Sequence, residues 1–312
     1  MVRKSVRVDY GGPFDREAML KYLGRDPGNQ SERTRGIVFE RYLPIQGKNV
    51  HTRLELGMNS ARGDFRAAPT PRESRTARRL IRHMLGLDQP LEKFYRALKK
   101  EPAMTPVLTG RLGTRIPRLP DLWETLCWAI LGQQINLTFA YRLRNRLIRA
   151  ANPRAGDSAD PNHANEAPPR NIRPFPTPTQ VLAVSPAVLK RRQFSGAKIK
   201  YLRELALAFQ GGLAGDLPGA GEVQSEDDAR VFRETLLAVK GLGPWSVDYA
   251  LMRCGGYLDA LPVGDSGLRA ALKKTFSLND APDIRAQEKL MEPFRPYRSL
   301  ATYYLWKSLE TQ

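Results

Sequence analysis

Alternating hydrophobic and polar positions mark the first part of the chain as a small sheet. Val6 and Val8 alternate with polar residues, the stretch 51–56 does the same, and 37–42 is a third extended run. Alternation with a period of two predicts β-strands that bury one face. A helical pattern over 14–23 follows the first strand. We therefore predict an antiparallel sheet covered by helices.

The pattern changes after this sheet. Residues 62–72 contain Pro69 and Pro71 and are predicted to form a loop. Ser74 is then predicted to cap a helix that Gly86 ends, since short hydroxyl side chains favour N-caps and glycine favours the position after a helix.

Helical periodicity dominates from residue 90 onward. The breaks are 152–178, rich in Pro, Asn and Ala, and the glycine-rich stretch 211–221. The predicted helices cover 90–100, 122–131 after an Asp121 cap, 136–150, 179–189, 197–210, 228–239, 244–254, 266–276, 284–292 and 299–309. The fold class is therefore α+β. We expect an N-terminal α+β domain over 1–88 and an all-helical core in two lobes over 89–312, with 152–173 as a flexible insertion.

Composition narrows the class of protein. The 312 residues carry 50 Lys and Arg against 32 Asp and Glu, a formal charge of +18, which favours a polyanionic partner such as nucleic acid. Cys127 and Cys254 are too few for an iron–sulfur cluster or a disulfide framework, and the three histidines lack metal-site spacing. We expect no cofactor and no metal held by side chains. Because no apolar run of about 18 residues and no secretory signal is present, we expect a cytoplasmic protein without a membrane partner.

The stretch 236–246, LLAVKGLGPWS, is the densest candidate for nucleic-acid binding. Gly241 and Gly243 permit a tight hairpin with positive φ, and Pro244 suits the first turn of a following helix. Exposed backbone N–H groups at such a helix start can bind a phosphate. We interpret 231–254 as a helix–hairpin–helix DNA clamp. An ordinary helix turn is the alternative, because glycine pairs are common.

Asp265 follows about 20 residues after this hairpin, in the stretch 261–269, LPVGDSGLR. An aspartate before an amphipathic helix is most often an N-cap. Its position after an apolar segment also predicts that it lies in a groove, where a carboxylate could act on a substrate.

The hairpin, together with Pro262-Val263-Gly264-Asp265, resembles the helix–hairpin–helix–GPD superfamily of base-excision glycosylases, and within it the 3-methyladenine DNA glycosylase II or AlkA type. Further blocks agree in the family's order. They are 12–23, 129–134, 175–178 and 293–306, so the resemblance spans nearly the whole chain except 152–173.

This resemblance implies a role for each candidate residue. Asp265 would be the catalytic carboxylate, and the flipped base would be bound by Tyr22, Trp245, Tyr249 and Trp306. Trp245 and Tyr249 are four residues apart and therefore share a helix face, and aromatic faces attract a cationic alkylated purine. Without the resemblance, a place in the hydrophobic core is the commoner fate of such aromatics.

DNA contacts follow from the same resemblance. Gln133 and Gln134 would supply the wedge that fills the gap left by the flipped nucleotide, although a polar loop between helices is the plainer interpretation. Gln134 departs from the pattern, which often has an apolar residue at this position. Lys240, Gly241 and Gly243 would hold the phosphates.

The function implied is excision of alkylated purines from duplex DNA in base-excision repair, by a monomer acting at the nucleoid. The glycosylase/lyase branch usually has a lysine just after the hairpin, and Trp245 at that position favours a monofunctional enzyme. The alternatives are a bifunctional glycosylase/lyase for oxidised bases and a helix–hairpin–helix DNA-binding protein without catalysis. The range of lesions, and whether Asp265 activates water or stabilises the cationic sugar, stay open at this stage.

Overall fold

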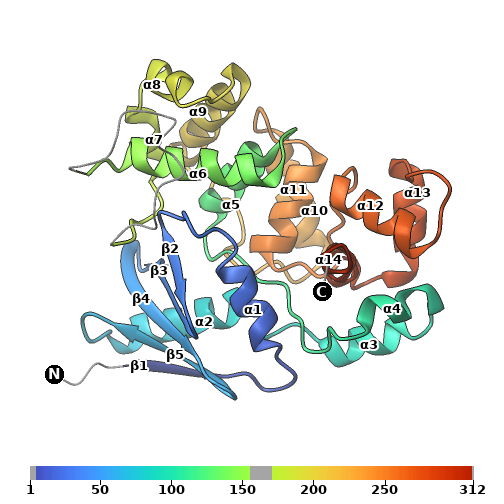
Figure 1. Cartoon of the computed structure of the whole chain (residues 1–312). Coiled ribbons are helices and arrows are strands. Elements are labelled where there is room, and N and C mark those ends of the chain that lie inside the picture. The colour runs from blue at the N-terminus through green and yellow to red at the C-terminus, as the bar shows by residue number, and fades with distance from the viewer. Residues whose placement is uncertain (1–4, 155–170, 311–312) are drawn as a thin grey trace.

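A computed structural model describes residues 5–154 and 171–310 and begins with a five-stranded antiparallel sheet (Figure 1). The strand order is β1-β5-β4-β3-β2. The strands are β1 (Ser5–Asp9), β2 (Glu32–Arg35), β3 (Val38–Ile45), β4 (Lys48–Leu56) and β5 (Ser60–Phe65). The predicted alternation is confirmed in β3, where every second residue is buried. The strand β5 corrects the prediction of a loop from residue 62, because pairing with β1 and β4 overrides the weak local pattern.

Two helices cover this sheet, α1 (Arg16–Leu23) and α2 (Pro71–Met84). The buried face of α2 includes Leu80 and Ile81, which join the apolar side chains of the strands in one cluster. A Cβ at Gly63 of β5 would lie 2.9 Å from the Cδ1 of Ile81, so this glycine lets the helix approach closely. Thr70, not Ser74, caps α2 through a capping box with Glu73. The helix therefore starts earlier than predicted, with Pro71 in its first turn.

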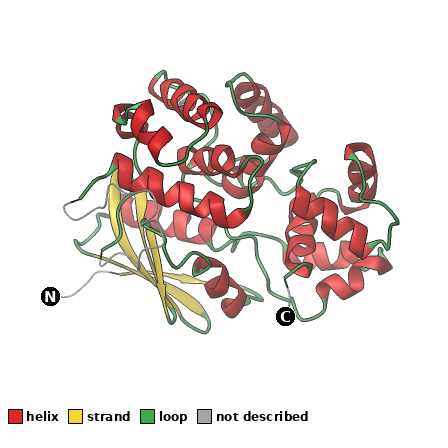
Figure 2. Ribbon diagram, turned by 45° about the horizontal axis from the view of Figure 1, so that its top comes forward, coloured by secondary structure: helices red, strands yellow, loops and turns green. Residues whose placement is uncertain are grey.

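The rest of the described chain is helical and forms two groups, with α12 to α14 beside α3 and α4 in one of them (Figures 1 and 2). The α-helices are α3 (Leu91–Leu98), α4 (Thr105–Leu108), α5 (Leu122–Gly132), α6 (Leu137–Ala151), α7 (Pro178–Ala183), α8 (Pro186–Arg191), α9 (Gly196–Gln210), α10 (Glu226–Leu237), α11 (Pro244–Ala250), α12 (Ser266–Thr275), α13 (Ile284–Met291) and α14 (Arg298–Ser308). Short 3₁₀ turns lie at Pro102–Met104 and Glu292–Phe294.

Two predicted helices differ from the structure. The helix predicted over 179–189 is divided into α7 and α8, because Ser185 caps a new helix whose first residue is Pro186. The helix predicted over 244–254 ends as α11 at Ala250 and continues as a π-helical turn, Leu251–Gly255. A π-turn rotates the side chains that follow it relative to a regular α-helix.

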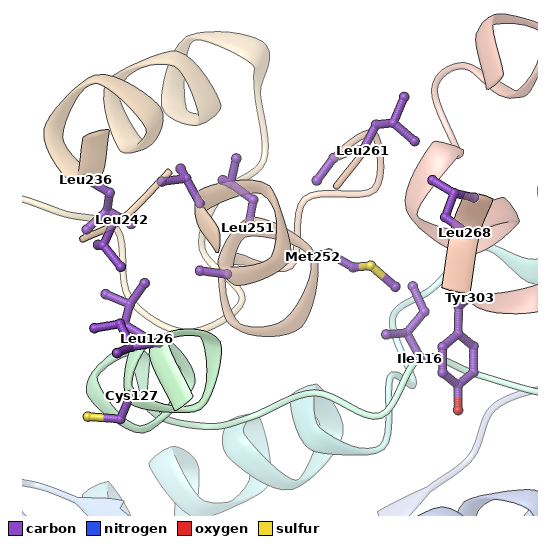
Figure 3. Packing of buried hydrophobic residues seen from close by; sticks show 14 of the residues in the cluster. Ile116, Leu126, Cys127, Leu236, Leu242, Leu251, Met252, Leu261, Leu268 and Tyr303 are labelled. Carbon is purple, nitrogen blue, oxygen red and sulfur yellow. The ribbon is translucent and has the colours of Figure 1, made fainter. Parts of the chain in front are cut away.

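The helical core is held together around α5 and the hairpin between α10 and α11. Leu236 and Leu242, from either end of that hairpin, lie beside Leu126 of α5, and Leu251 packs in the same cluster (Figure 3). All four side chains are buried. This packing fixes the hairpin and the start of α11 relative to the rest of the core.

A buried ion-pair network joins the sheet to the helical core. The Glu124 carboxylate of α5 accepts hydrogen bonds from Arg41 of β3 at 2.7 Å and from Arg144 of α6 at 2.6 Å. Arg41 also pairs with Glu32 of β2 at 2.7 Å. Breaking a buried pair leaves an uncompensated charge, so separating the sheet from the helical core at this network would be costly. The predicted boundary between residues 88 and 89 stays a prediction.

Most of the predicted insertion, residues 155–170, lies outside the described residues. Its two ends are joined by hydrogen bonds, from Asn152 Nδ2 to the Pro174 carbonyl at 3.0 Å and from Arg173 to the Asn152 carbonyl at 2.7 Å. The segment therefore leaves and re-enters the fold at nearly the same place.

Candidate active site

A cleft of about 1110 Å³ lies where the end of α1 meets α5, α6, α11 and α14. It contains every residue that the sequence analysis assigned to the catalytic and base-binding positions. Its lining includes Tyr22, Arg25, Asp26, Trp128, Ile135, Tyr141, Arg142, Trp245, Tyr249, Arg253, Asp265, Tyr303, Trp306 and Lys307. Residues far apart in the sequence are thus brought to one place.

Asp265 is both an N-cap and a cleft residue, so the two interpretations of this position are compatible. Its Oδ1 accepts the backbone N–H of Leu268 at 2.7 Å, which caps α12. The same oxygen accepts the indole N–H of Trp306 at 2.8 Å, and Oδ2 accepts that of Trp245 at 3.1 Å. These three hydrogen bonds fix the orientation of the carboxylate. Gly264, with a φ of 82°, makes the turn that places Asp265 there.

The predicted aromatic residues line the same cleft as this carboxylate and come from three helices. Trp245 and Tyr249 lie four residues apart on α11 and stack with ring centroids 5.5 Å apart and an interplanar angle of 28°. Trp306 comes from α14 and Tyr22 from α1. Tyr249 is buried, whereas Tyr22, Trp245 and Trp306 are partly exposed in the cleft. All four line the cleft, and Trp306 also packs against the hydrophobic core.

Further cleft residues were missed by sequence reasoning. Trp128 of α5 stacks on Tyr141 of α6 with centroids 5.0 Å apart. Trp128 sits in a strongly apolar helix, whose pattern predicts only core positions. Arg253 lies four residues after Tyr249, and that spacing could have revealed it. Arg25 lies just after α1, and no pattern in the sequence marks it.

The hairpin has the predicted turn with one correction. Gly241 has a φ of 98°, and a Cβ there would lie 2.3 Å from the Cγ of Tyr201. Gly243 has a φ of −106°, so the prediction of positive φ at this position was wrong. Gly243 is the N-cap of α11 and carries no side chain, so the helix starts without a side-chain cap. Lys240, in the same hairpin, is exposed.

The two glutamines before α6 differ in their surroundings. Gln133 Nε2 donates to the Gly241 carbonyl at 2.9 Å and to Ser246 Oγ at 3.2 Å, so Gln133 braces the hairpin. Gln134 is exposed and has a φ of 56°. Lys198 Nζ donates to the Gln133 carbonyl at 2.7 Å and holds this turn. Of the pair, Gln134 is the one placed to project from the surface.

Residues 5–154 and 171–310 contain no group of three or more His, Cys, Asp and Glu side chains that could hold a metal ion. In the same described ranges no helix is long and apolar enough to cross a membrane. Cys127 and Cys254 are buried free thiols, and burial raises the pKa of both.

The sequence matches two known family models. Residues 127–296 match the model of the HhH-GPD superfamily of base excision DNA repair proteins. The chain belongs to this superfamily. Residues 5–121 match the AlkA N-terminal domain, which covers the sheet. The predicted family and fold class are therefore confirmed.

Relatives named as a DNA-3-methyladenine glycosylase and as an AlkA DNA repair enzyme are similar to this chain over most of its length. A DNA-3-methyladenine glycosylase of Bacillus subtilis is 30% identical over 233 residues, which cover 73% of this chain and 71% of that protein. A probable bifunctional transcriptional activator/DNA repair enzyme AlkA of Mycobacterium tuberculosis is 30% identical over 98% of this chain, which spans 57% of that longer protein. The fold is also that of a 3-methyladenine DNA-glycosylase from Archaeoglobus fulgidus, with a TM-score of 0.74, 20% identity and coverage of 96% of this chain and 97% of that one.

Proposed function

We propose that this protein is a monofunctional DNA glycosylase that flips alkylated purines, of the 3-methyladenine type, out of duplex DNA and hydrolyses their N-glycosidic bond. The observation that carries the proposal is the Asp265 carboxylate, held by the indoles of Trp245 and Trp306 inside an aromatic cleft. Such a carboxylate beside stacking surfaces suits a cationic sugar and a flipped base. The superfamily and the B. subtilis relative support the same activity.

DNA binding follows from the surface around the cleft. The uncapped start of α11 can bind a phosphate through its backbone N–H groups, and Lys240 adds a positive charge beside it. Gln134 is exposed at the edge of the cleft region and is the proposed wedge that takes the place of the flipped nucleotide. The hydrogen bond from Gln133 to the Gly241 carbonyl holds the turn that carries Gln134 next to the hairpin. We further propose that the protein acts as a monomer on the nucleoid in the cytoplasm.

Excision requires the bond from C1′ to the base nitrogen to break, which develops positive charge on the sugar. Asp265 stabilises that charge electrostatically in a site partly closed to water. The two indole N–H groups fix the carboxylate before the reaction, so little reorganisation is needed. A purine alkylated on the ring is cationic in DNA and leaves as a neutral base, so one carboxylate suffices for it.

A bifunctional lyase would need an amine that reaches C1′. Trp245 follows the hairpin where that branch has lysine, and Lys307 is the lysine among the cleft-lining residues. Its Nζ is paired with Glu310 at 2.7 Å. The nucleophile of such a lyase is a free lysine amine, and this ion pair holds the Lys307 Nζ against Glu310.

The test is incubation of the purified chain with duplexes that carry 3-methyladenine or 7-methylguanine, followed by chromatography of the released bases. We expect free base, an intact abasic strand and no covalent adduct after borohydride reduction. Strand cleavage with a trapped adduct would instead show a lyase. Tight, salt-dependent DNA binding without base release would show a DNA-binding protein that is not an enzyme.

A further inference from the structure

Five arginines lie on one side of α2, and together they are called the arginine row. Each lies three or four residues from another, the spacing that places side chains on one face of a helix. They are Arg72, Arg75, Arg78, Arg79 and Arg82. The opposite face of α2 packs on the sheet. A groove of about 420 Å³ lies along the row, and four of the five arginines line it.

Most of the charge of the arginine row is not neutralised within the protein. Arg79 pairs with Glu222 at 3.2 Å, and Arg82 pairs with Asp88. Both pairs are exposed to solvent, so they contribute little and exchange readily for another anion. The other three arginines take part in none of the ion pairs within 4.0 Å that the described part of the chain forms. The acidic residue of α2, Glu73, is engaged in the capping box.

Arginines on the solvent-facing side of the neighbouring sheet are balanced by carboxylates. Arg53 of β4 lies opposite Asp64 of β5 and pairs with it at 3.4 Å. Arg62 of β5 lies opposite Glu55 of β4 and pairs with it at 3.2 Å. The outer face of α2 departs from this pattern, since it carries five arginines and one acidic residue. Its positive charge is therefore available to an anionic partner.

The length of the arginine row matches a stretch of DNA backbone. Arg72 and Arg82 are ten residues apart, which is about 15 Å along a helix. At about 3.4 Å per phosphate, one DNA strand places about four phosphates in that length. The groove lining contains no aromatic or large aliphatic side chain, whereas surfaces that bind proteins are enriched in aromatics. These features favour a phosphate backbone over an acidic peptide.

The arginine row and the hairpin clamp lie on separate parts of the molecule. The hairpin packs against Tyr201 of α9, near the top of Figure 1, whereas α2 lies beside the sheet in the lower half. Arg79 donates to the Ala220 carbonyl at 2.7 Å, before the start of α10, and the hairpin follows the end of α10. The twelve residues of α10 are about 18 Å long. No residue of α2 lines the catalytic cleft.

We infer that the arginine row is a second DNA-binding surface, which binds the phosphate backbone of a DNA segment other than the one held at the clamp and cleft. This inference goes beyond the glycosylase activity and rests on the clamp proposed above as the first surface. Because phosphate contacts carry no sequence information, the second surface accepts any duplex. With two surfaces the protein contacts a new DNA segment before it leaves the old one.

The experiment measures capture of a second duplex by protein that is already bound to a first. A duplex with an abasic-site analogue is immobilised, loaded with the full chain and washed, and a fluorescent undamaged duplex is then added at increasing salt. The test variant combines Arg72→Gln, Arg75→Gln and Arg78→Gln, which remove the three unpaired charges of the row. Glutamine is a good helix former, so α2 should persist.

A control variant removes the same amount of charge from another exposed place. It combines Arg96→Gln, Lys99→Gln and Lys100→Gln at the end of α3. Both variants should release 7-methylguanine at the wild-type rate, because neither set of residues lines the cleft. We expect wild type and the α3 variant to capture the second duplex and the row variant to capture it weakly. Three lost phosphate contacts lower the salt slope by about 2.7, so between about 50 and 200 mM salt wild type should lose about 40-fold more affinity for the second duplex than the row variant does.

The other outcomes contradict the inference in distinguishable ways. Wild type that stays on the abasic duplex but captures no second duplex overturns the inference and leaves the glycosylase proposal intact. Equal capture by all three proteins, or an equal loss in both variants, shows that the arginine row has no special part in capture and also overturns it. Binding of a polyglutamate peptide without capture of duplex would assign the row to an acidic protein partner instead. Wild type that does not stay on the abasic duplex overturns the proposed clamp, and the inference with it.

Discussion

Gly241 is the position where the DNA-binding hairpin depends most directly on glycine. Its φ of 98° is a conformation that L side chains rarely adopt, and a Cβ would lie 2.3 Å from Tyr201 Cγ and 2.6 Å from Tyr201 Cβ. The backbone strain of Gly241→Ala costs about 1–2 kcal/mol. Displacing a packed ring adds about 1–3 kcal/mol. We therefore expect Gly241→Ala to lower the free energy of unfolding by about 2–5 kcal/mol, a large share of a typical total of about 5–15 kcal/mol.

Gly243→Ala is the matched control in the same hairpin. Among the described residues no atom lies within 4 Å of the Cβ it would add, and its φ of −106° suits any residue. Because an N-cap prefers glycine to alanine, its unfolding free energy should fall by no more than about 1 kcal/mol. Urea unfolding monitored by tryptophan fluorescence measures all three proteins. A Gly241→Ala variant as stable as Gly243→Ala would refute the packing account of the hairpin.

Three further predictions concern the clamp, the carboxylate and acid stability. Gly243→Asp should fold normally yet weaken duplex binding, most strongly at low salt, because it places a negative charge where α11 meets phosphate. Unchanged affinity in a salt titration would argue against the clamp. Trp306→Phe keeps an aromatic surface but removes the donor to Asp265. Single-turnover excision should slow about 10- to 100-fold, because a hydrogen bond to a charged group contributes about 1.5–3 kcal/mol. An unchanged rate would show that this hydrogen bond does not contribute to excision. Burial, aided by the positive charge of Arg118, lowers the pKa of His83 to about 3. The unfolded chain binds this proton below its ordinary pKa of 6.5, so stability falls as pH falls from 6.5 towards 3, and His83→Gln should flatten the curve of unfolding free energy between pH 6.5 and 4.5; parallel curves would exclude this residue as the cause.

Local patterns in the sequence predicted the strands β1, β3 and β4 and nearly every helix of the core. They failed at β5, because Gly63 and charged residues there resemble a loop and only pairing with two neighbours makes a strand. They also failed at the start of α2, where Thr70 and Ser74 are both chemically suitable caps. Choosing between them depends on the packing of the helix against the sheet.

The site was predictable where residues act through fixed spacing along the chain. Trp245, Tyr249 and Asp265 fall in this class, since one helix face and one turn place them. Arg25 and Trp128 do not, because their approach to Tyr22 and Tyr141 depends on how α1 docks against α5 and α6. Hydrogen bonds from Arg25 to Tyr141 and from Asn145 to Asp26 join the end of α1 to α6, and these partners lie more than 100 residues apart in the sequence.

The central claim is that the charge of Asp265 drives cleavage of the glycosidic bond. Asp265→Asn keeps an acceptor for the Leu268 N–H, so α12 should remain capped and the melting transition nearly unchanged. The decisive measurement is single-turnover release of 3-methyladenine by this variant, alongside its affinity for a duplex with an abasic-site analogue. We predict a rate loss on the order of 10²–10³ with affinity equal to or tighter than wild type. Release at the wild-type rate would contradict the account and leave Asp265 as a helix cap alone.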